Sequence, residues 1–128
     1  MNRIGANDCK GTFGELLVQL RLLQHGVQAA PPIKDSGNDL SAIKGEQFRA
    51  VQVKLRKSDK IRVSKLPEQF HILAIVAIDP PVSIPDVRLD DCKVFLLPVE
   101  ESHEKVYKLE ELNKWEISQG LVNSLFQG

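Results

Sequence analysis

The sequence has few of the residues on which several functional classes depend. Its only two cysteines, Cys9 and Cys92, lie far apart and match no metal-ligand spacing. The three histidines show no ligand spacing either, and no phosphate-binding loop or nucleophile elbow is present. Because residues 1–10 are polar and carry no secretory leader, we interpret both cysteines as free thiols and expect a cytoplasmic protein.

Long hydrophobic runs are also missing. The longest covers seven residues, 72–78, which is too short to cross a bilayer and suits a buried strand. With 128 residues, 42% of them hydrophobic and 27% charged, the chain has the size and composition of one globular domain. We therefore expect a single domain over residues 1–128 with no membrane role.

Net charge is zero, with 17 basic and 17 acidic side chains, but the charges are unevenly placed. The segment from Lys44 to Lys65 holds eight basic and two acidic residues, a net charge of +6. Such a segment can hold a polyanion, although charge alone fits a solvated loop as well. The candidate contacts to a nucleic-acid backbone are Ser41, Arg56, Lys57, Lys60 and Arg62.

Hydrophobic periodicity predicts a first helix that follows a capping Asn7, Asp8 or Thr12 and ends at His25-Gly26. Strands are expected at 27–30, 48–55, 70–78 and 93–99, a helix from 108, and a closing turn or short helix at 121–126. Residues 66–70 could form one helical turn, although Ile61 and Val63 alternate as in a strand. This order predicts an α/β domain with a mixed sheet. The apolar positions of the first helix recur at helical spacing and are expected to pack inward: Phe13, Leu16, Leu17, Leu20 and Leu23.

The stretch from residue 37 to 54 predicts a β-hairpin. If Gly45-Glu46 forms a two-residue turn of the glycine-first kind, Ile43 faces Phe48 and Asp39 faces Gln52. Strand alternation then places Lys54 on the same side as Gln52. We therefore expect three polar side chains to converge over one surface of the sheet.

This group suits a divalent cation beside a phosphodiester. Mg²⁺ prefers oxygen ligands and keeps several waters, and a neighbouring lysine can neutralise the developing anion. The expected ligands are Asp39, the Val53 carbonyl and Glu15 from the first helix, with Lys54 as the electrostatic partner. Gln52 offers only a neutral oxygen, so we expect weak metal affinity without substrate.

Three short motifs, Gly14-Glu15, Gly37-Asn38-Asp39 and Gln52-Val53-Lys54, carry a resemblance to a known family. In this order they resemble the PD-(D/E)xK nuclease superfamily, and most of all its glutamine branches such as the Mrr-type restriction endonucleases. The layout is also similar to archaeal Holliday junction resolvases. The resemblance covers residues 12–57 and extends to the next strand.

The resemblance implies a restriction-endonuclease-like αβββαβ core, a mixed β-sheet flanked by helices. It also implies hydrolysis of DNA by a homodimer with Mg²⁺ or Mn²⁺. Glu15 and Asp39 would bind metal, and Gln52 and Lys54 would complete the catalytic set. Two positions depart from the family pattern, because Asn38 stands where proline is usual and Gln52 replaces an acid.

Three of the candidate site residues also have a simpler structural interpretation. Asp39 could bond its own turn, Lys54 could belong to the exposed stripe of an edge strand, and Glu15 could complement the helix dipole. The whole chain could be an inactive nucleic-acid-binding module, a defence-associated partner protein that works through its acidic C-terminal half, or a nuclease acting on RNA.

Overall fold

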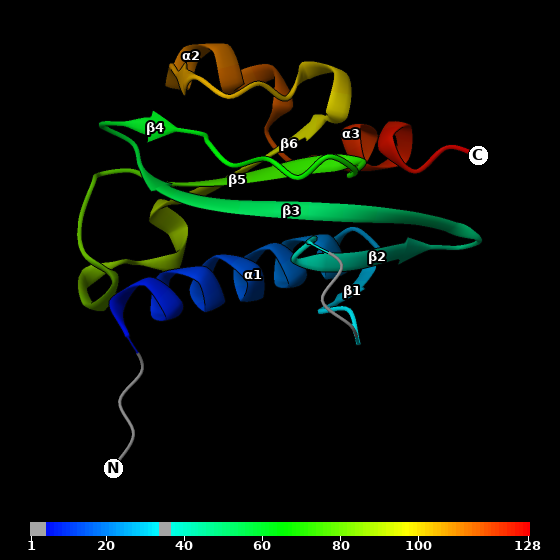
Figure 1. The fold of residues 1–128 in the computed structure, drawn as a ribbon, viewed down its shortest axis with the longest axis horizontal. Coiled ribbons are helices and arrows are strands. Elements are labelled where there is room, and N and C mark those ends of the chain that lie inside the picture. Colours follow the sequence, from blue (N-terminus) through cyan, green and yellow to red (C-terminus); the bar gives the residue numbers. More distant parts are fainter. Residues whose placement is uncertain (1–4, 34–36) are drawn as a thin grey trace.

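The computed structural model describes residues 5–33 and 37–128, which are built around a five-stranded mixed sheet (Figure 1). The strand order is β1-β2-β3-β5-β6, and only β3 and β5 pair in parallel. The predicted α/β class with a mixed sheet flanked by helices is therefore confirmed. The strands are β1 (Gln28–Ala30), β2 (Leu40–Lys44), β3 (Gln47–Lys57), β5 (Ile72–Ile78) and β6 (Cys92–Pro98).

The hairpin of β2 and β3 has the predicted register. Ile43 pairs with Phe48 and Lys44 pairs with Gln47. Gly45 has a φ of 60°, a backbone conformation that only glycine adopts without strain, as a glycine-first turn requires. The turn chemistry therefore sets which side chains of β3 share a face.

Helix α1 (Ala6–Gln24) covers one face of the sheet (Figure 1). It ends at His25 and Gly26 as predicted, and Gly26 has a φ of 81°. The predicted side-chain cap is wrong, because Gly5 precedes the helix and makes no side-chain cap bond. The predicted inward stripe is also wrong in part, since Leu16 and Leu23 are 59% and 61% exposed and Leu20 is exposed as well. The buried face consists of Gly14, Leu17, Val18 and Leu22.

Strand β5 is buried along its whole length, which confirms the prediction of cover on both faces. Ile72, Ala74 and Val76 face α1 and the short helix α3 (Gln119–Leu125). The alternate residues face the opposite layer, made of β4 (Ile61–Arg62), β7 (Val106–Tyr107) and α2 (Leu109–Leu112). That second layer lies across the sheet from α1 (Figure 1).

The connection from β3 to β5 differs from the expected αβββαβ order. Residues 58–71 contain the two-residue strand β4 and no helix, so the helical turn predicted at 66–70 is wrong. Several of the other connections contain 3₁₀ turns. No helix among the described residues is long and apolar enough to span a membrane. These turns are η1 (Ile84–Asp86), η2 (Leu89–Asp91), η3 (Val99–Glu101) and η4 (Asn113–Trp115).

Candidate functional site

Asp39 lies directly before Leu40, the first residue of β2, where the ladder of β2 with β3 ends and β3 goes on paired with β5 only. Its backbone N–H donates to the Val51 carbonyl (3.1 Å), and its Oδ2 accepts from the Val53 N–H (2.8 Å). The carboxylate therefore bonds the neighbouring strand. Because N–H and C=O of one residue in a strand point to the same side, the Val53 carbonyl is also directed toward this edge. The prediction that Asp39 stands over one surface is thus refined, since its carboxylate lies at the edge of the sheet.

Glu15 reaches the same edge from α1. It is the tenth residue of that helix, which excludes a first-turn acid that complements the helix dipole. Burial raises the pKa of the Glu15 carboxyl above its ordinary value, and the charge of Asp39 raises this pKa further. The two carboxylates therefore share one electrostatic environment.

Gly14 lets α1 approach β3 closely enough to place Glu15. A Cβ at this position would lie 3.3 Å from the Leu55 Cβ and 3.4 Å from the Val53 Cγ1. The first distance is tighter than ordinary side-chain contact and the second lies at its limit, so a larger residue here requires a small shift of α1 or of Leu55. The Gly-Glu pair is therefore explained by packing as well as by chemistry.

We expect Gly14→Ala to be less stable than Gly11→Ala by about 1 kcal/mol, measured by urea unfolding. Both changes gain helix propensity, but a Cβ at Gly11 meets nothing within 4 Å. The comparison on one helix thus isolates the crowding at Leu55 and Val53. Equal stability of the two variants would contradict the close approach.

Gln52 lies on the sheet face opposite α1, paired in register with Leu73. It is only 8% exposed, and among the described residues it is the one buried polar side chain. Its Oε1 has no hydrogen-bond partner there. An unpaired buried oxygen costs free energy, so it indicates a missing partner such as a cation or water.

Lys54 follows on the same face, half-buried. Burial lowers the pKa of its ammonium group and so does the charge of Arg56, whereas Asp39 raises this pKa. Lys54 pairs in register with Ile75 of β5, whereas the ladder with β2 ends at Val51, so β3 is open on one side here. Lys54 is half-buried and therefore does not belong to an exposed stripe.

Together these residues offer the donor set of a hard divalent cation. Two carboxylates (Glu15 and Asp39), the unpaired Gln52 Oε1 and the Val53 carbonyl are all oxygen ligands of the kind that Mg²⁺ and Mn²⁺ accept. The described residues contain no group of three or more His, Cys, Asp or Glu that could hold a metal. A cation here would therefore depend on the amide and the backbone as well as on the two acids.

Comparison with solved structures finds the bacterial homing endonuclease I-Ssp6803I, with a TM-score of 0.59. The match covers 93% of this chain and 88% of that one at 16% sequence identity. The chain has a nuclease-like fold. No family model and no curated protein matches its sequence.

The predicted nucleic-acid contacts are spread over several places. Ser41 pairs with Ala50 and so shares the face of Gln52. Arg56 is used by the fold, since its Nε donates to the Arg62 carbonyl (2.7 Å) and its Nη1 to the Leu55 carbonyl (2.8 Å). Arg62 itself is exposed, and Lys57 and Lys60 line a cavity of about 720 Å³ beyond Leu55 at the start of α1.

Three further residues belong to the surroundings of the site, and sequence reasoning did not assign them to it. Asn38 donates from Nδ2 to the Gln69 carbonyl (3.0 Å), and its Oδ1 is buried without a partner among the described residues. The charges of Lys65 and Glu104 act on Lys54, lowering and raising its pKa respectively. No local sequence pattern indicates this proximity, because Lys65 arrives with the connection after β3 and Glu104 with the segment before β7.

Proposed function

We propose that the chain is a metal-dependent endonuclease of the PD-(D/E)xK type, in its glutamine variant, that hydrolyses DNA phosphodiester bonds. One observation carries the proposal: the Asp39 carboxylate is bonded to the Val53 N–H of β3 (2.8 Å), where its charge acts on both Glu15 of α1 and Lys54 of β3. The unpaired Gln52 oxygen lies on the same sheet face as Lys54. The nuclease-like fold supports it, and I-Ssp6803I is itself a homing endonuclease.

The residues present fit a bound Mg²⁺ or Mn²⁺. Glu15, Asp39, Gln52 and the Val53 carbonyl would hold the ion, which supplies a water of lowered pKa and charge neutralisation on the phosphoryl oxygens. Lys54 provides a fixed positive charge for the anion that develops at the phosphate. The bond from Val53 N–H to Asp39 Oδ2 orients that carboxylate before any ligand arrives.

DNA is the proposed substrate, and the basic residues near the site are its proposed contacts. Lys57, Lys60 and Arg62 are exposed, so their charges are available to phosphates. We also propose that the chain acts as a homodimer, because cutting both strands of a duplex requires two active sites. Sedimentation of the purified chain would measure its oligomeric state.

The decisive experiment is a cleavage assay on linear, branched and single-stranded DNA in Mg²⁺, in Mn²⁺ and in EDTA. We expect cleavage with either metal and none in EDTA. Lys54→Ala should lower the rate by about 10²-fold, as expected for loss of one preorganised charge. Lys114→Ala is the matched control, since Lys114 is exposed on η4 against the opposite edge strand β6.

Other results of this assay would favour a different function. DNA binding without cleavage in any metal would favour an inactive nucleic-acid-binding module, a function consistent with the replacement of an acid by Gln52. Cleavage of RNA but not of DNA would overturn the substrate. Failure to bind nucleic acid even at low salt, where phosphate contacts are strongest, would leave only a protein partner.

A further inference from the structure

The connection between β3 and β5, residues 58–71, folds over the sheet face that carries Gln52 and Lys54. Its apolar residues pack into the same cluster as Leu73 and Ile75, so the segment forms part of the wall of the site. It is fixed to three separate elements of the chain. The anchoring hydrogen bonds join Arg56 Nε to Arg62 O (2.7 Å), Val63 N to Lys105 O (2.8 Å) and Asn38 Nδ2 to Gln69 O (3.0 Å).

Lys65 occupies a costly backbone conformation within this segment. Its φ is 56°, and it is the one residue other than glycine with a positive φ in the described part of the chain. The next residue holds the conformation in place, since the Leu66 N–H donates to Glu104 Oε1 (3.0 Å). Glycine would adopt this φ without the penalty. A lysine here therefore supplies something that glycine lacks, a long cationic side chain.

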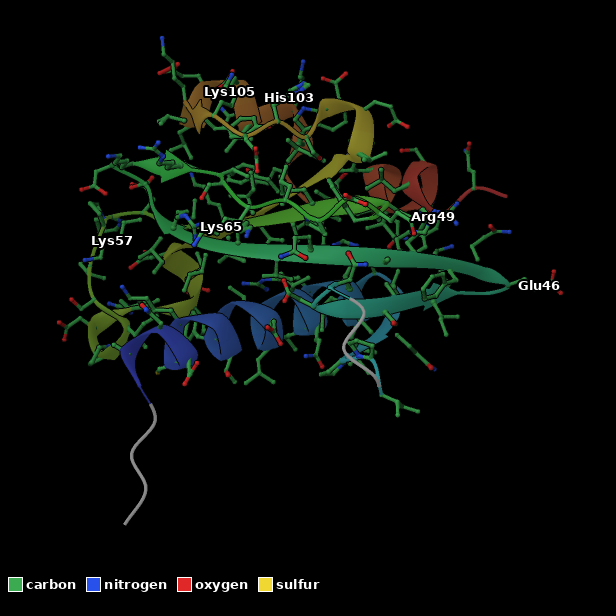
Figure 2. All side chains as sticks on the ribbon, viewed as in Figure 1. Glu46, Arg49, Lys57, Lys65, His103 and Lys105 are labelled. Atoms are coloured by element: carbon green, nitrogen blue, oxygen red, sulfur yellow. The ribbon has the colours of Figure 1, made fainter. Side chains whose placement is uncertain are left out.

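The charge of Lys65 is directed toward the site. Figure 2 shows Lys65 beside β3, on the side of β4, and its charge is one of four that act on Lys54, with those of Arg56, Asp39 and Glu104. Lys65 is exposed and forms no salt bridge with a described residue. Arg49 and Arg56 differ from Lys65 in this respect. Their guanidinium groups already donate to backbone carbonyls of the protein, so they are engaged within the fold.

We propose that Lys65 is a second cation of the site and binds a phosphate of the substrate DNA next to Lys54. The inference rests on the proposed function. It adds to the site a residue that lies outside the three short motifs on which the family resemblance is based. The charges of Lys54 and Lys65 repel each other, and a phosphate bound between them would offset that repulsion. Hydrogen bonds hold the segment that carries Lys65 before the DNA arrives, so its backbone needs no ordering on binding.

The test measures DNA affinity in EDTA as a function of salt, for the whole chain and its variants. Losing one phosphate contact should reduce the slope of log K against log salt by about 0.9, and the affinity in 0.1 M salt by about fivefold to tenfold. We expect both effects in Lys65→Ala and in Lys65→Gly, little change in Lys65→Arg, and none in the control Lys114→Ala. Thermal unfolding should show a higher Tm for Lys65→Gly than for Lys65→Ala, because glycine relieves the strain.

The readouts separate this proposal from the nuclease itself. A slope unchanged in Lys65→Ala and Lys65→Gly would overturn the phosphate contact even if the parent chain cleaves DNA. A reduced slope in a parent chain that binds but never cleaves would support the contact and overturn the nuclease. A parent chain with no salt-dependent binding would overturn both.

Discussion

Asp39→Asn should abolish metal-dependent cleavage, with a loss on the order of 10³-fold in rate. The amide oxygen of asparagine can still accept the Val53 N–H bond that Asp39 Oδ2 accepts at 2.8 Å, so the hairpin edge keeps its structure. What disappears is the negative charge of Asp39, which acts on both Glu15 and Lys54. The rate of cleavage in Mg²⁺ measures the effect, and urea unfolding checks that stability is unchanged.

Asp90→Asn is the matched control, because Asp90 is exposed on the short turn η2, which leads into β6, and β5 separates β6 from β3. It should cleave as fast as the parent chain. If Asp39→Asn retained more than a tenth of the parent rate with an intact fold, Asp39 would not be a metal ligand.

Gln52→Leu should make the metal-free protein more stable and the enzyme inactive. Leucine has a similar volume and would face Leu73 in an apolar layer, and it removes the unpaired buried Oε1. Removing that polar atom should stabilise the fold by roughly 1–2 kcal/mol. Losing a metal ligand should lower the cleavage rate by about 10³-fold.

Thermal unfolding with and without Mn²⁺ measures both effects. A ligand that binds only the folded state raises its Tm, so Mn²⁺ should stabilise the parent chain and leave Gln52→Leu unchanged. Gln52→Glu is the companion variant, since it restores a carboxylate oxygen and should keep cleavage. If Gln52→Leu cleaved normally, the amide would be a structural residue and the metal would be held without it.

The hairpin could be predicted from the sequence because its register depends on local chemistry. Gly45 in the turn determines the pairing of Ile43 with Phe48, and strand alternation carries that register to Gln52 and Lys54. The site residues on β3 were therefore placed on the correct face. The position of the Asp39 carboxylate was not, because β3 outlasts β2 at that point and its free edge captures the carboxylate.

The buried face of α1 was assigned wrongly because periodicity gives weight to large side chains. Leu16, Leu20 and Leu23 repeat at helical spacing yet are exposed. The sheet instead receives the face centred on Gly14, where the absence of a side chain allows the closest approach to Val53 and Leu55. A glycine among large apolar residues therefore indicates which face of the helix packs on the sheet, and counting apolar positions does not reveal it.

The connection after β3 could not be predicted, since long-range contacts decide its path. A local reading of residues 66–70 favours a helical turn, but the Leu66 N–H bonds Glu104 and the Gln69 carbonyl accepts from Asn38. Partners 38 and 31 residues away in sequence leave no local pattern. The position of Lys65 near the site follows from these bonds together with the packing of the segment's apolar residues.

The same bonds have a consequence for the order in which the molecule becomes active. Strand β4 has its ladder partner in β7, Val63 bonds Lys105, and Leu66 bonds Glu104, so the last quarter of the chain holds the wall of the site. During synthesis the motifs from Glu15 to Lys54 emerge first, but their covering segment has nothing to dock on until residues 104–107 follow. We therefore expect the growing chain to be unable to cleave nucleic acid until most of it has been synthesised.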